Sequence, residues 1–93
     1  MAVMEYEYDD EKSEATLQDR GIDFDFAARV FDGDFIEYED KRHDYGERRY
    51  VAIGPIEGTV FAVVYTWRND RRRIISARRA SRRERDAYRR TIT

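Results

Sequence analysis

The chain has 93 residues, of which 41% are hydrophobic and 41% are charged, with 13 aromatic residues and no cysteine. This length predicts one domain over residues 1–93, and the composition excludes a disulfide framework and a thiolate metal site. The start of the chain lacks the basic region and apolar run of a secretory signal, and no apolar stretch approaches the roughly 18 residues of a membrane span. We therefore expect a cytoplasmic protein with no membrane partner.

The net charge of −2 conceals a strong division along the sequence. Residues 1–40 carry 14 acidic and 3 basic side chains, whereas residues 41–93 carry 6 acidic and 15 basic ones. Arginine outnumbers lysine 16 to 2, and its planar guanidinium suits bidentate contacts with phosphate or carboxylate groups. The division favours a basic face that meets phosphates or an acidic partner. A coding bias toward arginine, together with solvated surfaces, is the alternative explanation.

The first third of the chain predicts a short strand and two helices. Residues 5–9 alternate acidic and tyrosine side chains, which is typical of an edge strand with the tyrosines turned inward. Asp9 is a suitable N-cap for a helix over residues 10–20, and Gly21 is a suitable residue to end it. A second helix is expected over residues 25–31, where apolar side chains four apart form one face for a sheet.

The rest of the chain predicts four strands and a final helix. The strands are expected over residues 35–40, 47–54, 59–67 and 72–78, with a polar loop at 41–46, a hairpin loop at 54–58 and a reversal at Asn69-Asp70. The strand at 59–67 is apolar on both alternating faces, so it should be central and covered on both sides. Ser81 and Glu84 have capping-box spacing, which opens a polar helix to about residue 90. The order predicts an α+β domain with a mainly antiparallel sheet.

Most familiar chemical signatures are absent, including glycine-rich phosphate loops, metal-spaced histidine pairs and nucleophile elbows. We therefore expect no metal and no cofactor. What remains is a group of polar residues on or beside adjacent strands: His43, Glu47, Arg48, Arg49, Arg73, Arg78 and Arg79. RNA cleavage without metal needs a base, an acid and cations against the charge that develops on phosphorus. His43 or Glu47 would handle protons, and the arginines would hold phosphate.

Plainer explanations exist for each of these residues. A lone loop histidine is typically solvated, and Glu47 and Arg49 share a strand face where they would pair with charges across the sheet. The arginines of the last helix would form a solvated face. Trp67 and the tyrosines at alternating strand positions are more often core residues than a platform for stacking bases.

Several short motifs resemble BrnT-type toxins, from about Tyr6 to Tyr88. The motifs are Tyr8-Asp9-x-x-Lys12, Arg20-Gly21-Ile22-x-Phe24, Ala27-x-x-Val30-Phe31, Gly46-Glu47-x-Arg49-Tyr50 with Ile53-Gly54, and Arg73-Ile74-Ile75-Ser76-Ala77-Arg78-x-Ala80 with Glu84 and Tyr88. The resemblance implies a fold similar to RelE ribonucleases, with two N-terminal helices, a four- to five-stranded sheet and one C-terminal helix. It also implies the toxin of a type II toxin–antitoxin module, an endoribonuclease that inhibits translation and growth.

The resemblance implies partners and roles as well. The partner would be an antitoxin with a ribbon-helix-helix region, and the complex would bind operator DNA through the antitoxin and repress its own operon. By motif position and chemistry, the catalytic residues would be His43, Glu47, Arg49, Arg73 and Arg78, with Glu47 or His43 as the general base. Arg48, Arg72, Arg79 and Arg82 would contact RNA.

The chain departs from the family pattern at two positions. Family members commonly have asparagine where this chain has Thr16, and histidine where it has Arg20. Arginine does not deprotonate in proteins, so Arg20 cannot supply the proton chemistry of a histidine. A catalytically silent module that binds or assists a DNA-binding antitoxin is therefore the alternative function, and a plain RNA-binding protein is a third. Steep salt dependence of binding would separate phosphate contacts from an apolar partner interface.

Overall fold

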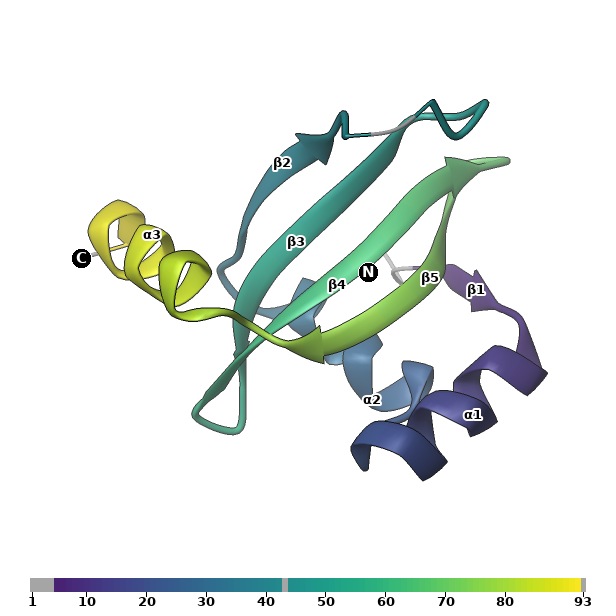
Figure 1. The fold of residues 1–93 in the computed structure, drawn as a ribbon, viewed down its shortest axis with the longest axis horizontal. Helices are drawn as coiled ribbons and strands as arrows, with labels where there is room; N and C mark the ends of the chain where they lie inside the picture. The colour runs from purple at the N-terminus through teal and green to yellow at the C-terminus, as the bar shows by residue number, and fades with distance from the viewer. Residues whose placement is uncertain (1–4, 43, 93) are drawn as a thin grey trace.

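The computed structural model describes residues 5–42 and 44–92 as a five-stranded sheet with helices at its sides (Figure 1). In chain order the elements are β1 (Tyr6–Tyr8), α1 (Asp10–Arg20), α2 (Phe24–Ala27), the 3-10 helix η1 (Ala28–Asp32), β2 (Ile36–Asp40), β3 (Arg49–Ile56), β4 (Thr59–Arg68), β5 (Arg71–Arg79) and α3 (Arg82–Ile92). The strand order is β1-β5-β4-β3-β2, with β1 parallel to β5 and every other pair antiparallel. The predicted α+β fold is confirmed. No helix within the described ranges is long and apolar enough to cross a membrane.

Helix α1 begins and ends where its local signals predict. The Asp9 carboxylate accepts a hydrogen bond from the Lys12 amide at 3.1 Å, which satisfies one of the free donors of the first turn. Gly21 adopts φ 78° and donates its amide to the Leu17 carbonyl, as a C-terminal glycine does. Its buried residue is Ser13, whose hydroxyl accepts from the Phe24 amide at 2.9 Å. The helix is thus fixed mainly by its ends and by one buried hydrogen bond.

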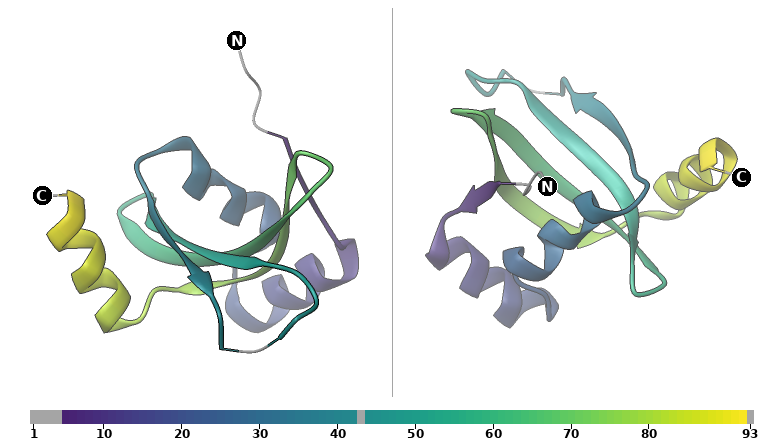
Figure 2. Two further views of the ribbon diagram at one scale, coloured as in Figure 1. Left: turned by 90° about the horizontal axis from the view of Figure 1, so that it is seen from above. Right: turned by 180° about the vertical axis from the view of Figure 1, so that it is seen from behind.

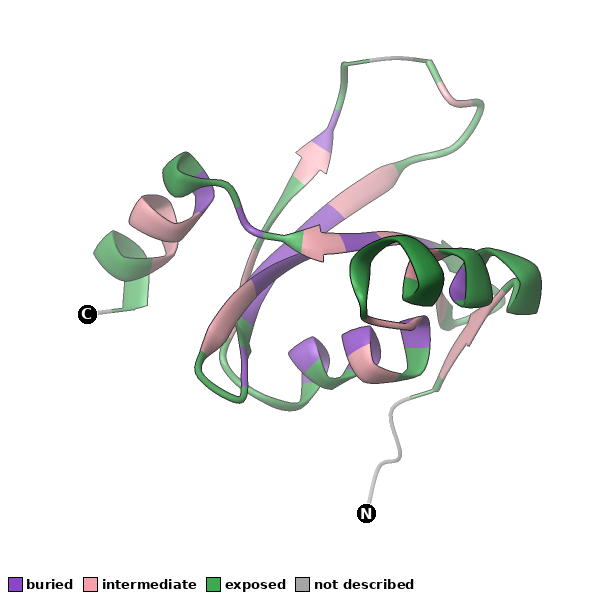
Figure 3. Cartoon of the chain, turned by 60° about the horizontal axis from the view of Figure 1, so that its bottom comes forward, coloured by how far each residue is buried: buried purple, intermediate pink, exposed green. Residues whose placement is uncertain are grey.

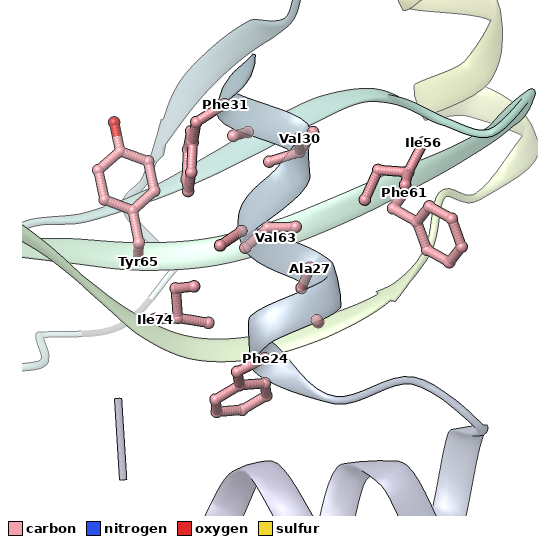
Figure 4. Close-up of a cluster of buried hydrophobic side chains, with 12 residues drawn as sticks. Phe24, Ala27, Val30, Phe31, Ile56, Phe61, Val63, Tyr65 and Ile74 are labelled. Atoms are coloured by element: carbon pink, nitrogen blue, oxygen red, sulfur yellow. The ribbon is translucent and has the colours of Figure 1, made fainter. Parts of the chain in front are cut away.

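The second predicted helix forms as α2 followed by η1, and it supplies five of the twelve buried residues of the main core. Asp23 caps α2 by accepting from the Phe26 amide at 2.8 Å, so the helix begins at residue 24, one residue earlier than predicted. Phe24, Ala27, Val30 and Phe31 pack onto strand residues such as Val63, Tyr65 and Ile74 (Figure 4). Seen from behind, α2 and η1 cross this face of the sheet (Figure 2). We call it the helix face.

The hairpin between β3 and β4 is tighter than predicted. The expected loop over residues 54–58 is wrong, because β3 continues to Ile56 and the turn contains only Glu57 and Gly58, both with positive φ. Pro55 fits the strand because it pairs with Val60, whose carbonyl accepts instead from the amide of Ala80, the residue that follows β5. Pro55 is therefore not required to donate to β4, and β2 has already ended on its other side. The predicted Asn69-Asp70 turn is confirmed, again with positive φ at both residues.

A β-bulge between β4 and β5 decides which arginines share a face. Val64 pairs with Ser76 and Tyr65 pairs with Ile74, so Ile75 is an extra residue on β5. In a regular strand Arg73 and Arg78, five residues apart, would point to opposite faces. The extra residue reverses the alternation, so both arginines lie on the face that α2 and η1 leave uncovered. We call this the open face.

Helix α3 lies beside the β2 and β3 end of the sheet and covers one end of the open face (Figures 1 and 2). The small cluster beneath it contains Val51, Ile53, Ala62 and Ala80, with Tyr88 packed against them. Strand β4 is central as predicted, but the expectation that both of its faces are covered holds only in part, because α3 covers only one end of the open face. Buried residues follow the strands and the inner sides of the helices, while the outer sides of α1 and α3 are exposed (Figure 3).

Candidate functional site

Cations stand at both ends of the open face. At one end Arg49 pairs with Asp40 of β2, and Arg73 pairs with Thr66 of β4. Two rows farther along the strands, Arg78 lies opposite Ala62. Thr66 and Ala62, which mark these two rows on β4, are four positions apart, so the rows are about 13 Å apart along the strand. The rows thus frame a surface on which phosphates of a single RNA strand can meet guanidinium groups at both ends.

Arg78 is held by a carboxylate from α3. Its two terminal nitrogens donate to the Glu84 carboxylate at 2.6 and 3.0 Å, a bidentate arrangement. Glu84 also accepts from the Tyr38 hydroxyl at 3.1 Å and from the Ser81 amide at 2.8 Å. The Glu84 amide donates to the Ser81 hydroxyl, which completes the predicted capping box. One carboxylate therefore ties β2, β5 and the start of α3 together.

The bidentate pair keeps Glu84 ionised. Mainly because of the hydrogen bonds from Arg78, the pKa of Glu84 falls from 4.5 to about 2, and the pKa of Arg78 rises in turn. Burial raises the pKa of the Tyr38 phenol, and Glu84 raises it further. Glu84 is thus a poor proton carrier near neutral pH, whereas Tyr38 stays protonated and can donate.

Arg49 has a polar atom that still needs an acceptor. Its guanidinium carbon lies 4.1 Å from the centre of the Tyr45 ring, and Glu47 approaches one terminal nitrogen at 3.7 Å. The buried Nε of Arg49 has no hydrogen-bond partner among residues 5–42 and 44–92. An orphaned buried donor is costly, and a phosphate oxygen would satisfy it. Among the described residues, the printed contact of the Glu47 carboxylate is this long one, so it is more available as a proton acceptor than the Glu84 carboxylate.

Two further carboxylates shape the same end of the open face. Glu7 of β1 accepts from Arg73 at 2.7 Å, and each of these side chains is 27% exposed. Asp40 is buried and accepts a bidentate contact from Arg42 at 3.0 and 2.9 Å. The Arg42 hydrogen bonds hold the pKa of Asp40 well below its ordinary value. Asp40 is therefore a fixed anion that orders this loop.

The structure separates the remaining predicted residues. Arg48 and Arg82 are exposed just before β3 and at the start of α3. Arg72 and Arg79 lie on the helix face, opposite Trp67 and Phe61 in the β4–β5 pairing. His43 lies outside the described residues. These five assignments stay predictions.

Sequence reasoning named Glu47, Arg49, Arg73 and Arg78 as residues on or beside adjacent strands, and the structure places the three arginines on one face. It missed Tyr38 and Glu7 and gave Glu84 only a helix cap. The sequence did contain an indication for Tyr38, because it lies two residues after Ile36 and therefore on the same, apolar face of the strand. Arg20, the departure from the family pattern, donates to the Ala77 carbonyl at 2.7 Å. It covers an edge of β5 that β1 does not reach.

Comparison with known proteins finds a sequence family and a solved structure that this chain resembles. The sequence model of a family described as "Ribonuclease toxin, BrnT, of type II toxin-antitoxin system" matches residues 8–84. The fold is similar to the 1.1 Å crystal structure of the Brucella abortus ribonuclease toxin BrnT, with a TM-score of 0.66 and 23% identity. That match covers 86% of this chain and 100% of the other. No curated protein matches the sequence.

Proposed function

Because this chain belongs to the BrnT family of ribonuclease toxins of type II toxin–antitoxin systems, we propose that it is itself a metal-independent endoribonuclease, held inactive in the cytoplasm by its cognate antitoxin. The observation that carries the proposal is the bulge at Ile75, which brings Arg73 onto the same face as Arg78 and Arg49. Three arginines on one sheet face suit a substrate that presents successive phosphates.

The proposed reaction is attack of a ribose 2′-oxygen on the adjacent phosphorus. Glu47, or His43 in the preceding loop, takes the 2′ proton as the new P–O bond forms. The bond to the 5′-oxygen breaks, and that oxygen receives a proton, for which Tyr38 is the candidate donor. Arg49, Arg73 and Arg78 stabilise the negative charge that develops on the phosphoryl oxygens. The products are a 2′,3′-cyclic phosphate and a free 5′-hydroxyl.

The two faces of β5 offer a matched pair of variants for the test. Arg78→Ala removes a cation from the open face, and Arg79→Ala removes its neighbour from the helix face. With purified protein, single-stranded RNA and EDTA, we expect Arg78→Ala to slow cleavage about 10²- to 10³-fold, as the loss of a transition-state donor does. At saturating RNA, where a lost binding contact does not limit the rate, Arg79→Ala should change the cleavage rate less than about fivefold. Equal losses in both variants would contradict an active site on the open face.

The proposed antitoxin is tested by expressing the protein in cells. We propose a ribbon-helix-helix antitoxin that represses the shared operon with the toxin, as the family resemblance implies. Induced expression should arrest growth with loss of RNA, and a neighbouring antitoxin gene should restore growth. Arg78→Ala and Glu47→Ala should be harmless at the same soluble level. A wild-type protein that is soluble and harmless would favour the silent binding module.

A further inference from the structure

Trp67 is the single tryptophan of the chain. It is 50% exposed and lies at the end of β4 that leads into the turn to β5. The expectation that it belongs to the core is therefore wrong. The Arg72 guanidinium carbon lies 4.6 Å from its ring centroid, and the Tyr65 ring meets it edge-on with centroids 5.8 Å apart. These contacts hold the indole in place while leaving half of its surface to solvent. A large aromatic ring that is fixed and exposed is a suitable platform for another flat ring.

Arg72 itself is fixed by a stack of aromatic rings. Its guanidinium carbon lies 4.4 Å from the centre of the Phe31 ring and 5.3 Å from that of Tyr65. The Tyr65 hydroxyl donates to Glu37 at 2.6 Å, which anchors the far side of the stack. Trp67 therefore rests on a layer that joins β2, η1 and β5, so its orientation does not depend on a mobile neighbour.

The strand register places positive charge on both sides of Trp67. Trp67 pairs with Arg72 on β5. On β3 the last ladder pair is Tyr50 with Tyr65, and the Arg48 carbonyl accepts from the Thr66 hydroxyl at 2.6 Å. Arg48 directly precedes β3, and continuing this register by two residues would place it beside Trp67 on the same face. The row would then be Arg48, Trp67 and Arg72.

Arginines and acidic residues both lie around Trp67. Arg68 and Arg71 face each other at the end of the hairpin, on the opposite side of the sheet. The acidic residues are Asp70 in the turn, Glu5, which pairs with Arg71 at 3.1 Å, Glu37, which accepts from the Tyr65 hydroxyl at 2.6 Å, and Glu47, which precedes Arg48 in the chain. Bases of single-stranded RNA bind where an aromatic face and arginines lie together.

We propose that Trp67 is a stacking site for an unpaired base of RNA, with Arg48 holding an adjoining phosphate. The site rests on the proposed function for its substrate class, and it adds a contact outside the catalytic face. Thr66 and Trp67 are neighbours on opposite faces, so an RNA strand that passes Arg73 on the open face reaches Trp67 by rounding the end of the sheet. The base stacked on Trp67 would thus lie beyond the cleaved bond and would fix the strand's position.

Because Trp67 is the single tryptophan, its fluorescence reports on this site alone. The probe is a single-stranded octanucleotide with 2′-O-methyl riboses, which lacks the nucleophile and is not cleaved. A duplex of the same sequence is the matched probe, because its bases are already stacked while its phosphates remain. We expect the single strand to quench Trp67 emission at saturation and the duplex to leave it almost unchanged. Anisotropy of a labelled octanucleotide measures binding independently.

Three variants complete the test. Trp67→Ala should weaken single-strand binding roughly tenfold, and Trp67→Phe, which keeps a ring and guards against misfolding, by less than about threefold. Leu17→Ala, at another exposed apolar residue, should bind like the wild type. Bound octanucleotide with unchanged emission, equal quenching by the duplex, or wild-type binding by Trp67→Ala would overturn the proposal. So would quenching by purified antitoxin and not by RNA. Cleavage by the open face is judged separately, through Arg78→Ala.

Discussion

Replacing Glu84 with glutamine tests whether one carboxylate organises both the open face and α3. Glutamine keeps the size of the side chain and can still accept from the Ser81 amide. It removes the charge that meets Arg78 at 2.6 and 3.0 Å, and its own amide hydrogens compete for the same space. The predicted result is a less stable protein whose Arg78 is no longer held in one orientation.

The expected loss of unfolding free energy depends on how exposed the side chains of Arg78 and Glu84 are. Hydrogen bonds to charged groups contribute about 1.5–3 kcal/mol each when buried. The Glu84 side chain is 11% exposed, but that of Arg78 is 39% exposed, so water can solvate the guanidinium once its partner is lost. We therefore expect Glu84→Gln to lower the free energy of unfolding by about 1.5 kcal/mol. For a chain of this size the melting temperature should fall by about 6–12 °C.

The loss should also depend on pH, with a sign set by the folded carboxylate. The pKa of Glu84 is about 2 in the folded protein and ordinarily 4.5. A lowered pKa means that ionised Glu84 stabilises the fold above pH 4.5 and that this contribution disappears as the pH falls toward 2. Urea unfolding followed by circular dichroism should show a large difference between wild type and Glu84→Gln at pH 6. The difference should shrink progressively below pH 4.5.

Ser81→Ala is the matched control, because it removes the helix cap and leaves the Arg78–Glu84 pair intact. It should cost about 1 kcal/mol, with no special dependence on acid. We expect kcat for RNA cleavage to fall at least tenfold in Glu84→Gln and to stay within twofold in Ser81→Ala. A stability difference between wild type and Glu84→Gln that stays constant from pH 6 to pH 2 would refute the reasoning.

Three other variants, one of them with a matched control, test separate parts of the structure. Gly54→Ala should lower the free energy of unfolding by about 1–3 kcal/mol, because its Cβ would lie 3.0–3.1 Å from three neighbouring atoms; Gly33→Ala, with open space around it, should melt like the wild type. Arg20→Ala should lose about 1 kcal/mol with its hydrogen bond to a β5 carbonyl, and lost cleavage at unchanged stability would instead place Arg20 in the site. Arg78→Lys should cleave RNA nearly as slowly as Arg78→Ala, since lysine cannot make the bidentate contact; near-normal cleavage would show that charge alone suffices.

The parts of the fold predicted correctly from sequence are those with local causes. Helix α1 depends on a cap at Asp9 and a left-handed residue at Gly21, and both act within a few residues. Strand β4 is apolar on both faces, so its central place in the sheet follows from composition. The turn at Asn69-Asp70 uses residue types that tolerate positive φ.

The parts that escaped prediction depend on pairing between distant strands. Simple alternation places Arg73 and Arg78 on opposite faces, and nothing within β5 marks Ile75 as an extra residue. The tight hairpin was missed because Pro55 suggests a loop until the pairing shows that it need not donate to β4. Glu84 was correctly predicted as a helix cap, but its contact with Arg78 follows only from where β5 ends. The candidate site was thus predictable as a set of residues and not as a geometry.

The pairing of β1 with β5 makes the sheet late to close during synthesis. Glu7 and Arg73 are 66 residues apart in the chain, and contacts of such separation form slowly because a long loop must close first. Strand β1 can pair only after β5 has been synthesised. Arg78 can bind Glu84 only after α3 has been synthesised. A nascent chain lacking β5 and α3 therefore carries Arg49 of the open face but not yet Arg73 and Arg78. The order of the strands delays assembly of the open face until β5 and α3 have been synthesised.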